Sequence, residues 1–532
     1  GISVDMSYTP QESAASSEMM CESLIKIFNY SQGLWLALRD YFGYDDWEDM
    51  IYGELAENRP VLYGGRGTAG GHQFICDGYS SDGFFHINWG WGGMSDGYFL
   101  LTALSPSSLG IGGGAGGFNT GQDAAIGVCP PKAGDKPVYI VFNTQGFTTS
   151  AATVNAGDTF RIEGLFINFS LVALPAGSKF GMKFTPADES EPIYSDSYDV
   201  SNLEPYNGYK SLPVIFPELE NGTYKITPAL YTEGEWSEIR MPVGKPSALT
   251  AVVNDKEATL SNSVAASVEI KDIEIRPVIY RDREFPMTFT VVNDSDEEYY
   301  GNVTPVLVDA DGNVVAKSAY SPIDVLPGKE DVITTYVADF VAEENQEFTV
   351  GDYKLVFTDD SGKYISSPVD VKVEDMTAET KITVTDFKLD SENPVPSPEN
   401  TQFSYKVACD SGIYYNSLDL IVFPGAGGYS VYSKPSERTY LEAGESADVK
   451  MTADMSNLED GDYMAMMYEG QTSKTDRVYF KIKKVATGIE VIEVETEEVA
   501  IYDLNGVRRE LPLSPGIYIL KTGGESRKLV VK

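Results

Sequence analysis

The two histidines of this 532-residue chain, His72 and His86, lie in one stretch of 24 residues, GGHQFICDGYSSDGFFHINWGWGG. Imidazole is the side chain that exchanges protons near neutral pH, so acid–base chemistry with unperturbed side chains would occur here. The residue pattern predicts a strand over 72–76 and another over 84–88, joined by a turn of Asp, Ser and Gly. The segment 89–93 then combines rigid tryptophans with a sharply turning backbone, which is the composition of a site mouth.

A purely structural interpretation also fits this stretch. In it the aromatic residues cover a hairpin, and the histidine is a structural residue whose hydrogen bonds are made within the protein. A wider set of motifs favours chemistry. In chain order they are GISVDM at 1–6, ENRPV at 57–61, GGH at 70–72, NWGWGG at 88–93, DGYF at 96–99 and ALSPSSLGIGGGAGGFNTGQ at 103–122. Together they resemble the histidine half of the streptopain family of cysteine peptidases, which are papain-like. The resemblance covers roughly residues 1–130 and implies an α+β fold.

The resemblance also implies roles for individual residues. His72 matches the catalytic histidine, which deprotonates a cysteine thiol and later protonates the leaving amine. Asn88 and Trp89 match the residues that orient and cover this imidazole. The glycine-rich run 110–117 matches a mobile loop beside the substrate groove, although such a run is also typical of a plain linker. The implied groove residues are Gly113, Gly114, Ala115, Gly116 and Trp91.

The thiolate nucleophile of such a peptidase is not evident in this chain. Cys76 follows His72 by four residues on the same expected strand, about 13 Å away at about 3.3 Å per residue, which is beyond hydrogen-bond reach. In the family the nucleophilic cysteine lies at a helix N-terminus well upstream of the histidine. We therefore expect the nucleophile upstream of Gly1, in a half of the domain lost by processing, by truncation or by a gene break. The chain alone is expected to be inactive.

The other three cysteines also fit structural positions better than catalytic ones. Cys21 lies in an expected helix, SSEMMCESLIKIF, capped by Ser16 or Ser17. Its spacing places it on the apolar stripe of that helix, together with Leu24, Ile25 and Phe28. Cys129 precedes two prolines at a domain edge, and Cys409 ends an alternating strand. Both are interpreted as incidental.

Two more helical segments are expected before the histidine strands. One spans about 34–42. The other begins at Asp45 or Asp46 and ends before Pro60. Its spacing predicts an apolar face made of Trp47, Ile51 and Leu55.

Beyond a polar, proline-containing linker at 132–137, nearly every segment has the pattern of a short strand. Three glycine–tyrosine strands recur, NGTYKI at 221–226, VGDYKLVF at 350–357 and DGDYMAMM at 460–467, with tyrosines 129 and 110 residues apart. That spacing is typical of one β-sandwich domain each. We therefore predict a peptidase-like domain at 1–132, followed by immunoglobulin-like modules at 133–265, 266–375 and 376–486.

The last stretch, 487–532, contains VAIYDLNGVRRELPLSPGIYILK and a basic tail. Its short strands and glycine turns resemble the C-terminal sorting domain of proteins exported by type IX secretion. The resemblance implies a secreted or surface-displayed bacterial protein. The chain has no recognisable signal peptide at its first residues, and secretion is expected nonetheless.

Composition excludes several other classes of protein. The chain has 40 basic and 80 acidic residues, a net charge of −40 that argues against nucleic-acid and anionic-membrane partners. No stretch reaches 18 uninterrupted apolar residues, so no membrane span is expected. The four scattered cysteines show no metal-ligand spacing, and the segment 309–313, DADGN, lacks the downstream glutamate of a calcium loop and predicts a hairpin turn. No cofactor or metal is expected.

The sequence thus predicts a multidomain protein, with a partial papain-like α+β domain followed by all-β modules and a small C-terminal β domain. The predicted function is peptide-bond hydrolysis by a Cys–His dyad, with protein or peptide substrates. Two alternatives stay open. The chain could be an inactive adhesin or protein-binding protein, or a subunit that docks onto a separate cysteine-bearing half of its own domain.

Overall fold

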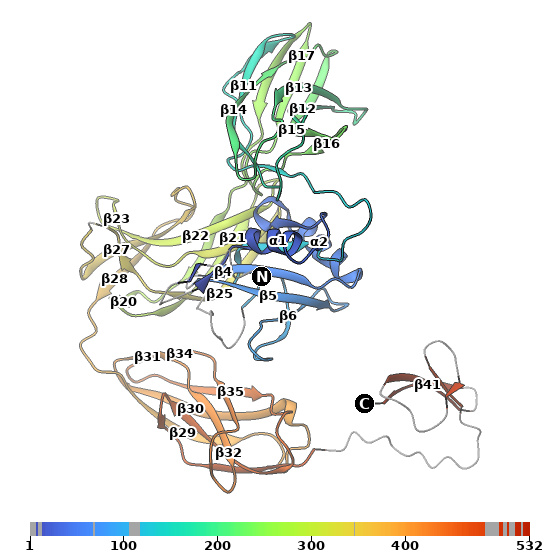
Figure 1. Cartoon of the computed structure of the whole chain (residues 1–532). Coiled ribbons are helices and arrows are strands. Elements are labelled where there is room, and N and C mark those ends of the chain that lie inside the picture. Colours follow the sequence, from blue (N-terminus) through green and yellow to red (C-terminus); the bar gives the residue numbers. More distant parts are fainter. Residues whose placement is uncertain are drawn as a thin grey trace. The chain divides into compact units, whose positions relative to one another are not determined.

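The chain folds into two compact units, Gly1–Thr377 and Ala378–Lys532. Its structure is a computed structural model that describes residues 7–8, 13–67, 70–105, 117–344 and 346–484 and the strand segments 500–503, 508–509, 516–522 and 525–531. Strands dominate both units (Figure 1). The protein is therefore multidomain and mostly β, in agreement with the expectation from sequence.

A six-stranded antiparallel sheet carries the histidine stretch, with strand order β3-β8-β4-β5-β6-β7. Helix α2 contacts β4, β5 and β8, and helix α1 contacts β3 and β8. A separate short pair precedes them, β1 and β2. The elements are β1 Ser7–Tyr8, β2 Ser13–Ala14, α1 Ser17–Lys26, β3 Trp35–Leu38, a 3-10 turn Arg39–Tyr41, α2 Tyr44–Ala56, β4 Val61–Gly67, β5 Gly70–Tyr79, β6 Phe85–Asn88, β7 Gly97–Phe99 and β8 Thr120–Ile126.

The core of this part lies between α2 and the sheet. Trp47, Ile51 and Leu55 of α2 are buried in it, which confirms the predicted apolar face. Along β5, Phe74 and Cys76 are buried in the same core, whereas the side chains at alternate positions are exposed. This alternation arises because successive side chains of a strand point to opposite faces of the sheet.

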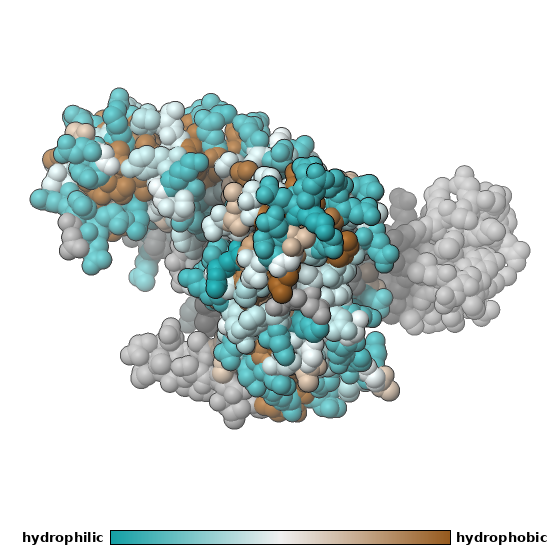
Figure 2. Space-filling model, turned by 90° about the horizontal axis from the view of Figure 1, so that it is seen from above, coloured by the Kyte–Doolittle hydropathy of each residue, from teal (hydrophilic) through white to brown (hydrophobic). Residues whose placement is uncertain are grey.

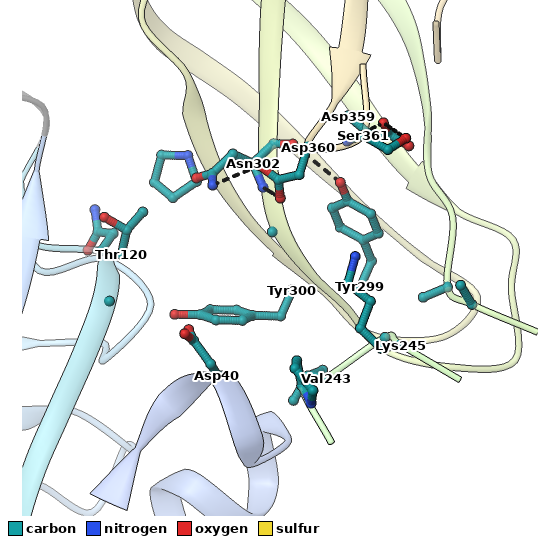
Figure 3. A pocket seen from close by; sticks show the side chains of 18 residues that line it. Asp40, Thr120, Val243, Lys245, Tyr299, Tyr300, Asn302, Asp359, Asp360 and Ser361 are labelled. Atoms are coloured by element: carbon teal, nitrogen blue, oxygen red, sulfur yellow. Dashed lines mark hydrogen bonds between the residues drawn. The ribbon is translucent and has the colours of Figure 1, made fainter. Parts of the chain in front are cut away.

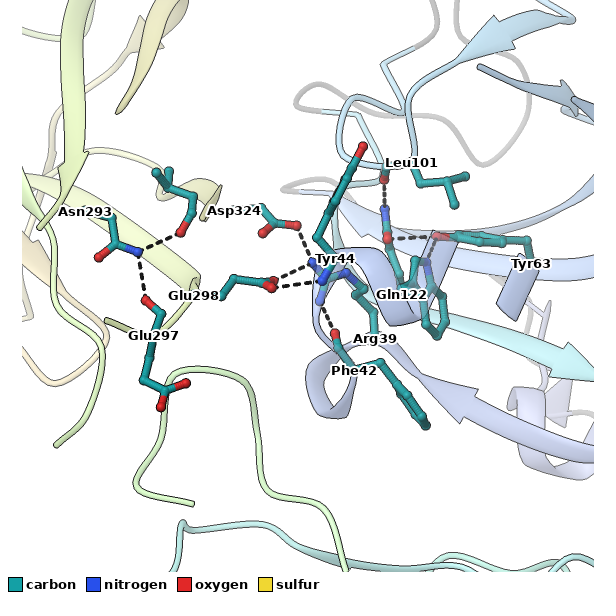
Figure 4. Close-up of polar contacts among 12 residues, drawn as sticks. Arg39, Phe42, Tyr44, Tyr63, Leu101, Gln122, Asn293, Glu297, Glu298 and Asp324 are labelled. Carbon is teal, nitrogen blue, oxygen red and sulfur yellow. Dashed lines mark hydrogen bonds and ion pairs between the residues drawn. The ribbon is translucent and has the colours of Figure 1, made fainter. Parts of the chain in front are cut away.

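A chain of buried hydrogen bonds ties α2 to the sheet and to a loop. Trp47 Nε1 donates to the Tyr63 hydroxyl at 2.8 Å, and that hydroxyl donates to Gln122 Oε1 at 2.8 Å. The amide of Gln122 in turn donates to the Leu101 carbonyl at 2.7 Å (Figure 4). Because every member of the chain has a partner, the polar atoms can be buried without a large free-energy cost.

The prediction of a helix over 34–42 is wrong. Trp35–Leu38 forms the edge strand β3, and only Arg39–Tyr41 is helical, as one 3-10 turn. Leu36 and Ala37 are buried where β3 pairs with β8. Pairing in the sheet thus outweighs the local helical spacing of apolar residues, as is common for short segments.

Helix α1 follows its prediction at the start and departs from it at the end. The side chain of Ser16 accepts the backbone N–H of Met19, so Ser16 is the N-cap. Cys21 is fully buried, as expected. The helix ends at Lys26, however, and Phe28 lies beyond it with 49% of its surface exposed, so the predicted apolar stripe does not extend to Phe28.

Residues 141–262 form two facing sheets in the first unit. The larger has the order β10-β18-β17-β15-β12-β13, with β16 on β15, and the smaller has the order β14-β11-β9. Both contribute to one apolar core, in which Phe166 of β11 and Phe180 of β12 have ring centroids 5.8 Å apart. The strands are β9 Val141–Asn143, β10 Thr153–Asn155, β11 Thr159–Asn168, β12 Lys179–Pro186, β13 Ile193–Asp199, β14 Gly208–Ile215, β15 Gly222–Thr232, β16 Glu235–Glu238, β17 Leu249–Asn254 and β18 Glu257–Asn262.

Residues 269–374 form a second pair of sheets. Their orders are β19-β21-β25 and β20-β28-β27-β22-β23-β26, with β24 on β22. Phe289 of β21 and Phe357 of β27 join the two sheets, with ring centroids 4.7 Å apart. The strands are β19 Glu269–Glu274, β20 Val278–Tyr280, β21 Phe285–Asn293, β22 Tyr299–Val308, β23 Val314–Lys317, β24 Ser321–Val325, β25 Lys329–Ala338, β26 Val341–Ala342, β27 Gly351–Asp359 and β28 Val369–Glu374.

The DADGN segment is a hairpin turn between β22 and β23, as predicted. Asp309 Oδ1 accepts the backbone N–H groups of Asp311 and Asn313, both at 2.9 Å. These bonds occupy the carboxylate within its own turn. The residue types and the turn geometry therefore agree on a structural role.

The second unit holds a third pair of sheets and the C-terminal strands. The orders are β29-β30-β35 and β33-β32-β36-β37, with β38 on β36, beside the pair β31-β34. A further sheet has the order β40-β39-β41-β42. The elements are β29 Lys381–Leu389, a 3-10 turn Pro398–Asn400, β30 Thr401–Ser411, β31 Ile413–Asn416, β32 Asp419–Pro424, β33 Tyr432–Pro435, β34 Thr439–Glu442, β35 Ser446–Ala453, β36 Gly461–Glu469, β37 Thr472–Ser473, β38 Val478–Ile482, β39 Ala500–Asp503, β40 Arg508–Arg509, β41 Gly516–Thr522 and β42 Glu525–Val531.

The three glycine–tyrosine strands share a hydrogen bond that the sequence does not reveal. Each tyrosine hydroxyl donates to the carbonyl oxygen of the residue four positions earlier, Tyr224 at 3.1 Å, Tyr353 at 2.9 Å and Tyr463 at 2.8 Å. Each tyrosine follows the glycine that begins its strand by two residues. The three strands thus begin with the same local contact, at the same distance from their first glycine.

A buried charged cluster joins the six-stranded sheet to the second pair of sheets. The guanidinium of Arg39 is 3.0 Å from the Glu298 carboxylate, also pairs with Asp324, and donates to the Phe42 carbonyl (Figure 4). The backbone N–H of Tyr44 donates to Glu298 at 2.9 Å. Arg39 is 1% exposed, so this contact is an interior one rather than a surface ion pair.

The cluster has two carboxylates for one guanidinium. Burial is the main cause that raises the pKa of Asp324, to about 7, and the negative charge of Glu298 adds to it. Arg39 acts in the opposite direction. Asp324 Oδ1 also has no hydrogen-bond partner within the described part of the chain. The second carboxylate is thus only partly compensated.

Hydrophilic residues dominate the face of the molecule shown in Figure 2, and apolar residues are interspersed among them. This agrees with the net charge of −40. Among the helices that the structure describes, none has the length and apolar character needed to cross a membrane.

Candidate active site

The backbone holds the imidazole of His72 in place on β5. Its Nε2 lies 2.8 Å from the carbonyl oxygen of Trp89. Because a carbonyl can only accept, Nε2 carries the proton of the neutral ring and Nδ1 carries none. No hydrogen bond to Nδ1 is found among the described residues. Nδ1 is therefore the atom that can take a proton from a reacting group.

Aromatic rings pack around this imidazole. Trp91 stacks on it with ring centroids 5.0 Å apart and planes 20° apart, and Phe118 lies 5.5 Å away. Trp89 is fully buried and stacks on Trp91 at 5.6 Å. Such rigid rings limit rotation of the imidazole and keep water from its faces.

Asn88 supports the site through the backbone. Its Oδ1 accepts the N–H of Gly90 at 2.9 Å, and the carbonyl of the same Trp89–Gly90 peptide group accepts from His72. Hydrogen bonds at both ends of one peptide group strengthen each other. Within the described contacts Asn88 makes no hydrogen bond to the imidazole itself, so any orienting effect passes through this peptide group.

Asp96 anchors the same turn, and sequence analysis assigned it no role. Its Oδ1 accepts the backbone N–H of Trp89 at 3.0 Å, and the Ser95 carbonyl accepts the Trp89 indole N–H at 3.0 Å. Asp96 thereby fixes the residue whose carbonyl holds His72. The DGYF motif at 96–99 was the available signal, but the partner of its aspartate depends on the turn between β6 and β7.

Two glycines before the histidine strand allow the segment 118–123 to approach the site closely. Gly65 pairs with His72 across β4 and β5, and a Cβ on Gly65 would lie 2.4 Å from the Phe118 carbonyl oxygen. A Cβ on Gly64 would lie 2.6 Å from the Asp123 carboxylate. Any larger side chain would push away the segment that places Phe118 against the imidazole.

Comparison with known proteins finds similarity to a peptidase family in this part of the chain. Residues 1–99 match the Peptidase C10 family. We call residues 1–99 the C10 region. Streptopain of Streptococcus pyogenes is 50% identical over 130 residues, which are 24% of this chain and 33% of that protein. Thiol protease/hemagglutinin PrtT of Porphyromonas gingivalis is 27% identical over 471 residues, 84% of this chain and 51% of that protein.

The chain therefore spans between a third and about half of the length of these relatives. Among solved structures, the trypsin-activated alpha-2-macroglobulin of Escherichia coli covers 68% of this chain and 32% of its own at 9% identity. Its TM-score of 0.14 is too low to indicate a shared fold.

The cysteines of the C10 region are unsuited to act as nucleophiles. Cys21 and Cys76 are fully buried, and burial raises the pKa of each thiol to about 12. Burial also raises the pKa of Cys409 in the second unit. A thiol with a raised pKa stays protonated at neutral pH and reacts slowly. Cys129 is half-buried, and no described contact joins it to His72.

Of the five expected groove residues, the structure describes one. Trp91 lies on the imidazole, whereas Gly113, Gly114, Ala115 and Gly116 fall outside the described residues. The mobile-loop interpretation of 110–117 therefore stays a prediction.

The second histidine belongs to a different cluster. His86 Nδ1 lies 2.5 Å from the Asp77 carboxylate across β5 and β6, and its ring meets Tyr98 at 5.1 Å. No described contact links His86 to His72. The two histidines of the motif thus have separate surroundings, and the aromatic cage surrounds His72.

Proposed function

We propose that the C10 region supplies the catalytic histidine of a cysteine peptidase that hydrolyses peptide bonds in proteins. The observation that carries this proposal is the imidazole of His72, which is held at Nε2 by the Trp89 carbonyl, stacked on Trp91 and free of described hydrogen bonds at Nδ1. The family match of residues 1–99 supports it.

In the proposed reaction a cysteine thiol gives its proton to His72 Nδ1, and the thiolate attacks the substrate carbonyl carbon. The imidazolium then gives that proton to the leaving amine as the peptide bond breaks. Water hydrolyses the resulting thioester. The Trp89 carbonyl stabilises the imidazolium through Nε2–H, while Asn88 and Asp96 fix the peptide groups on either side of Trp89. Gly113, Gly114, Ala115 and Gly116 would border the substrate groove.

The four cysteines of this chain do not supply the thiolate in this proposal. Cys21, Cys76 and Cys409 are buried, and Cys129 has no described contact with His72. A nucleophile on additional polypeptide, joined covalently or docked, would complete the site. The chain by itself would then be inactive.

The test is to label the protein, as its own host produces it, with an electrophilic cysteine-peptidase probe and to map the adducts by mass spectrometry. We expect an adduct on a cysteine other than these four. The adduct should be lost in His72→Ala and kept in His86→Ala, the matched control. Labelling of Cys21 or Cys76 would place the thiolate within this chain, and labelling that survives His72→Ala would contradict the assigned base.

Adhesion is a second candidate function for the strand-rich part. PrtT, whose name includes both thiol protease and hemagglutinin, matches 84% of this chain, so the match includes most of its strands. We propose that 133–265, 266–375 and 376–486 are immunoglobulin-like modules, and the repeated tyrosine hydrogen bond supports this. Agglutination of erythrocytes that persists in His72→Ala would favour adhesion, and its absence from the unmodified protein would exclude it.

We further propose that the protein is exported and that 487–532 is its type IX sorting domain. The small antiparallel sheet β40-β39-β41-β42 in this stretch and the acidic character of the chain support the proposal. Deleting 487–532 should retain the protein inside the producing cell. Unchanged export of the deleted form would contradict it.

A further inference from the structure

A pocket of about 460 Å³ lies where the first sheet meets the second pair of sheets (Figure 3). This volume is within the range of sites that hold small organic groups. Its wall is built from Asp40, 119–121, 242–245, 265–266, 299–302, Pro322 and 359–361. None of these residues belongs to the proposed peptidase site.

Three carboxylates line this junction pocket, and two of them are already used. Asp360 accepts the backbone N–H of Asn302 at 2.9 Å and its amide at 3.1 Å. Asp359 Oδ1 accepts two backbone N–H groups of its own turn, those of Ser361 and Lys363. The Asp40 carboxylate has no hydrogen bond among the described contacts, so it is the one left for an occupant.

The hydroxyl of Tyr300 is buried in the pocket wall without a hydrogen-bond partner in the described structure. In Figure 3 it points past the ring edge toward the carboxylate of Asp40 and toward Thr120. A buried polar atom without a partner is unfavourable, so an occupant that bonds to it is favoured. The guanidinium of Arg39 packs over the Tyr300 ring at 4.3 Å and is held by Glu298 and Asp324.

Asp40 has the character of a carboxylate in a concave site. Solvent reaches its side chain, yet protein atoms surround it, and this desolvation raises the pKa of Asp40 above its ordinary value. Arg39 and Arg66 act in the opposite direction. A positive group placed in the pocket would restore the interactions that the carboxylate has lost.

We propose that the junction pocket binds the cationic head group of a lysine or arginine side chain from a protein ligand. Asp40 provides the counter-charge and Tyr300 Oη accepts a hydrogen bond from the head group. Pro242, Val243 and Ala266 provide apolar surface for the side-chain stem. The net charge of −40 draws cationic ligands toward the protein.

The pocket has a direct chain connection to the proposed peptidase site. Its wall segment 119–121 follows Phe118, which packs against His72. A protein held by one basic side chain at 119–121 would lie close in sequence to Phe118, which packs against the imidazole. The binding itself does not require peptidase activity, so the two proposals can fail separately.

The test uses the full chain and two small probes of matched shape, ethylguanidinium and ethylurea, which differ in charge. Ligand-observed NMR titration at near-neutral pH should detect ethylguanidinium binding and little or no ethylurea binding. Asp40→Asn should weaken ethylguanidinium binding by about tenfold, because a charged hydrogen-bond partner is lost. Asp49→Asn on the exposed face of α2 removes the same charge outside the pocket and should leave binding unchanged.

Two further variants make the result specific. Lys245→Ala should strengthen binding, because the pocket loses a competing positive charge. Tyr300→Phe should weaken ethylguanidinium binding. This variant replaces Asp40→Asn in the test if circular dichroism shows that Asp40→Asn does not fold. Equal binding of both probes, equal loss in Asp40→Asn and Asp49→Asn, or no ethylguanidinium binding to the unmodified chain would each overturn the proposal.

Discussion

Replacing Asp324 by asparagine removes one of the two carboxylates that face the buried guanidinium of Arg39. Burial raises the pKa of Asp324 from its ordinary value of 3.8 to about 7. The folded protein therefore binds this proton more tightly than the unfolded chain does. The resulting stability is fully present below about pH 4 and is lost as the pH rises through about 7.

The size of the effect follows from the shift. Each unit of pKa difference corresponds to about 1.4 kcal/mol, so raising the pH from about 5 to about 8 should lower the free energy of unfolding by roughly 3 kcal/mol through Asp324 alone. Asp324→Asn cannot titrate and should lack this part of the pH dependence. The variant should match the unmodified protein below about pH 4 and exceed its stability at higher pH, most of all at about pH 8.

Tryptophan fluorescence during urea unfolding is a suitable assay. Four of the five tryptophans, at 35, 47, 89 and 91, lie in the part of the chain that contains Arg39. Asp370→Asn is the matched control, because it removes a carboxylate that is 88% exposed from the same pair of sheets as Asp324. The reasoning would be refuted if Asp324→Asn and Asp370→Asn showed the same change in stability between the two pH values.

Three further outcomes are expected. Cys21 and Cys76 should not react with iodoacetamide in the native protein at about pH 8, because burial raises the pKa of each thiol to about 12, and both should react after urea unfolding. Peptide mass spectrometry can locate the label, and labelling of either cysteine in the native protein would contradict this expectation. Tyr463→Phe should lower the stability of the second unit by about 1 kcal/mol through loss of one hydrogen bond, while exposed Tyr479→Phe should not, as measured by urea unfolding. If the proposed function holds, Asp96→Ala should slow cysteine-probe labelling of the protein that its own host produces by about tenfold or more, because the Trp89 N–H loses its acceptor. Circular dichroism should show an unchanged fold, and an unchanged labelling rate would exclude a positioning role for Asp96.

Several features of the fold could be predicted because they depend on neighbours in sequence. The apolar face of α2, the Ser16 cap and the Asp309 hairpin turn each need only residues within a few positions. The edge strand β3 could not be predicted, because Trp35–Leu38 is a strand only where β8 pairs with it. For the same reason the expected helix over 34–42 failed.

The candidate site divides in the same way. The family resemblance gave His72, Asn88, Trp89 and Trp91 as candidates, and these residues lie on one hairpin and the turn that follows it. The sequence did not predict that His72 Nε2 donates to a backbone carbonyl, because every residue type has such a carbonyl. It also assigned no role to Asp96, whose partner is set by the turn geometry.

By itself, the sequence determined the chemistry available to this protein: where its histidines lie, which strands alternate, and how acidic the chain is. The tertiary structure alone decided which distant groups meet. Arg39 finds Glu298 and Asp324 at separations of 259 and 285 residues, and Tyr300 reaches the pocket beside Asp40. The spacing of apolar residues in the sequence predicts which residues are buried. Which charged groups form ion pairs depends on how separate sheets pack together, and the sequence pattern does not contain that information.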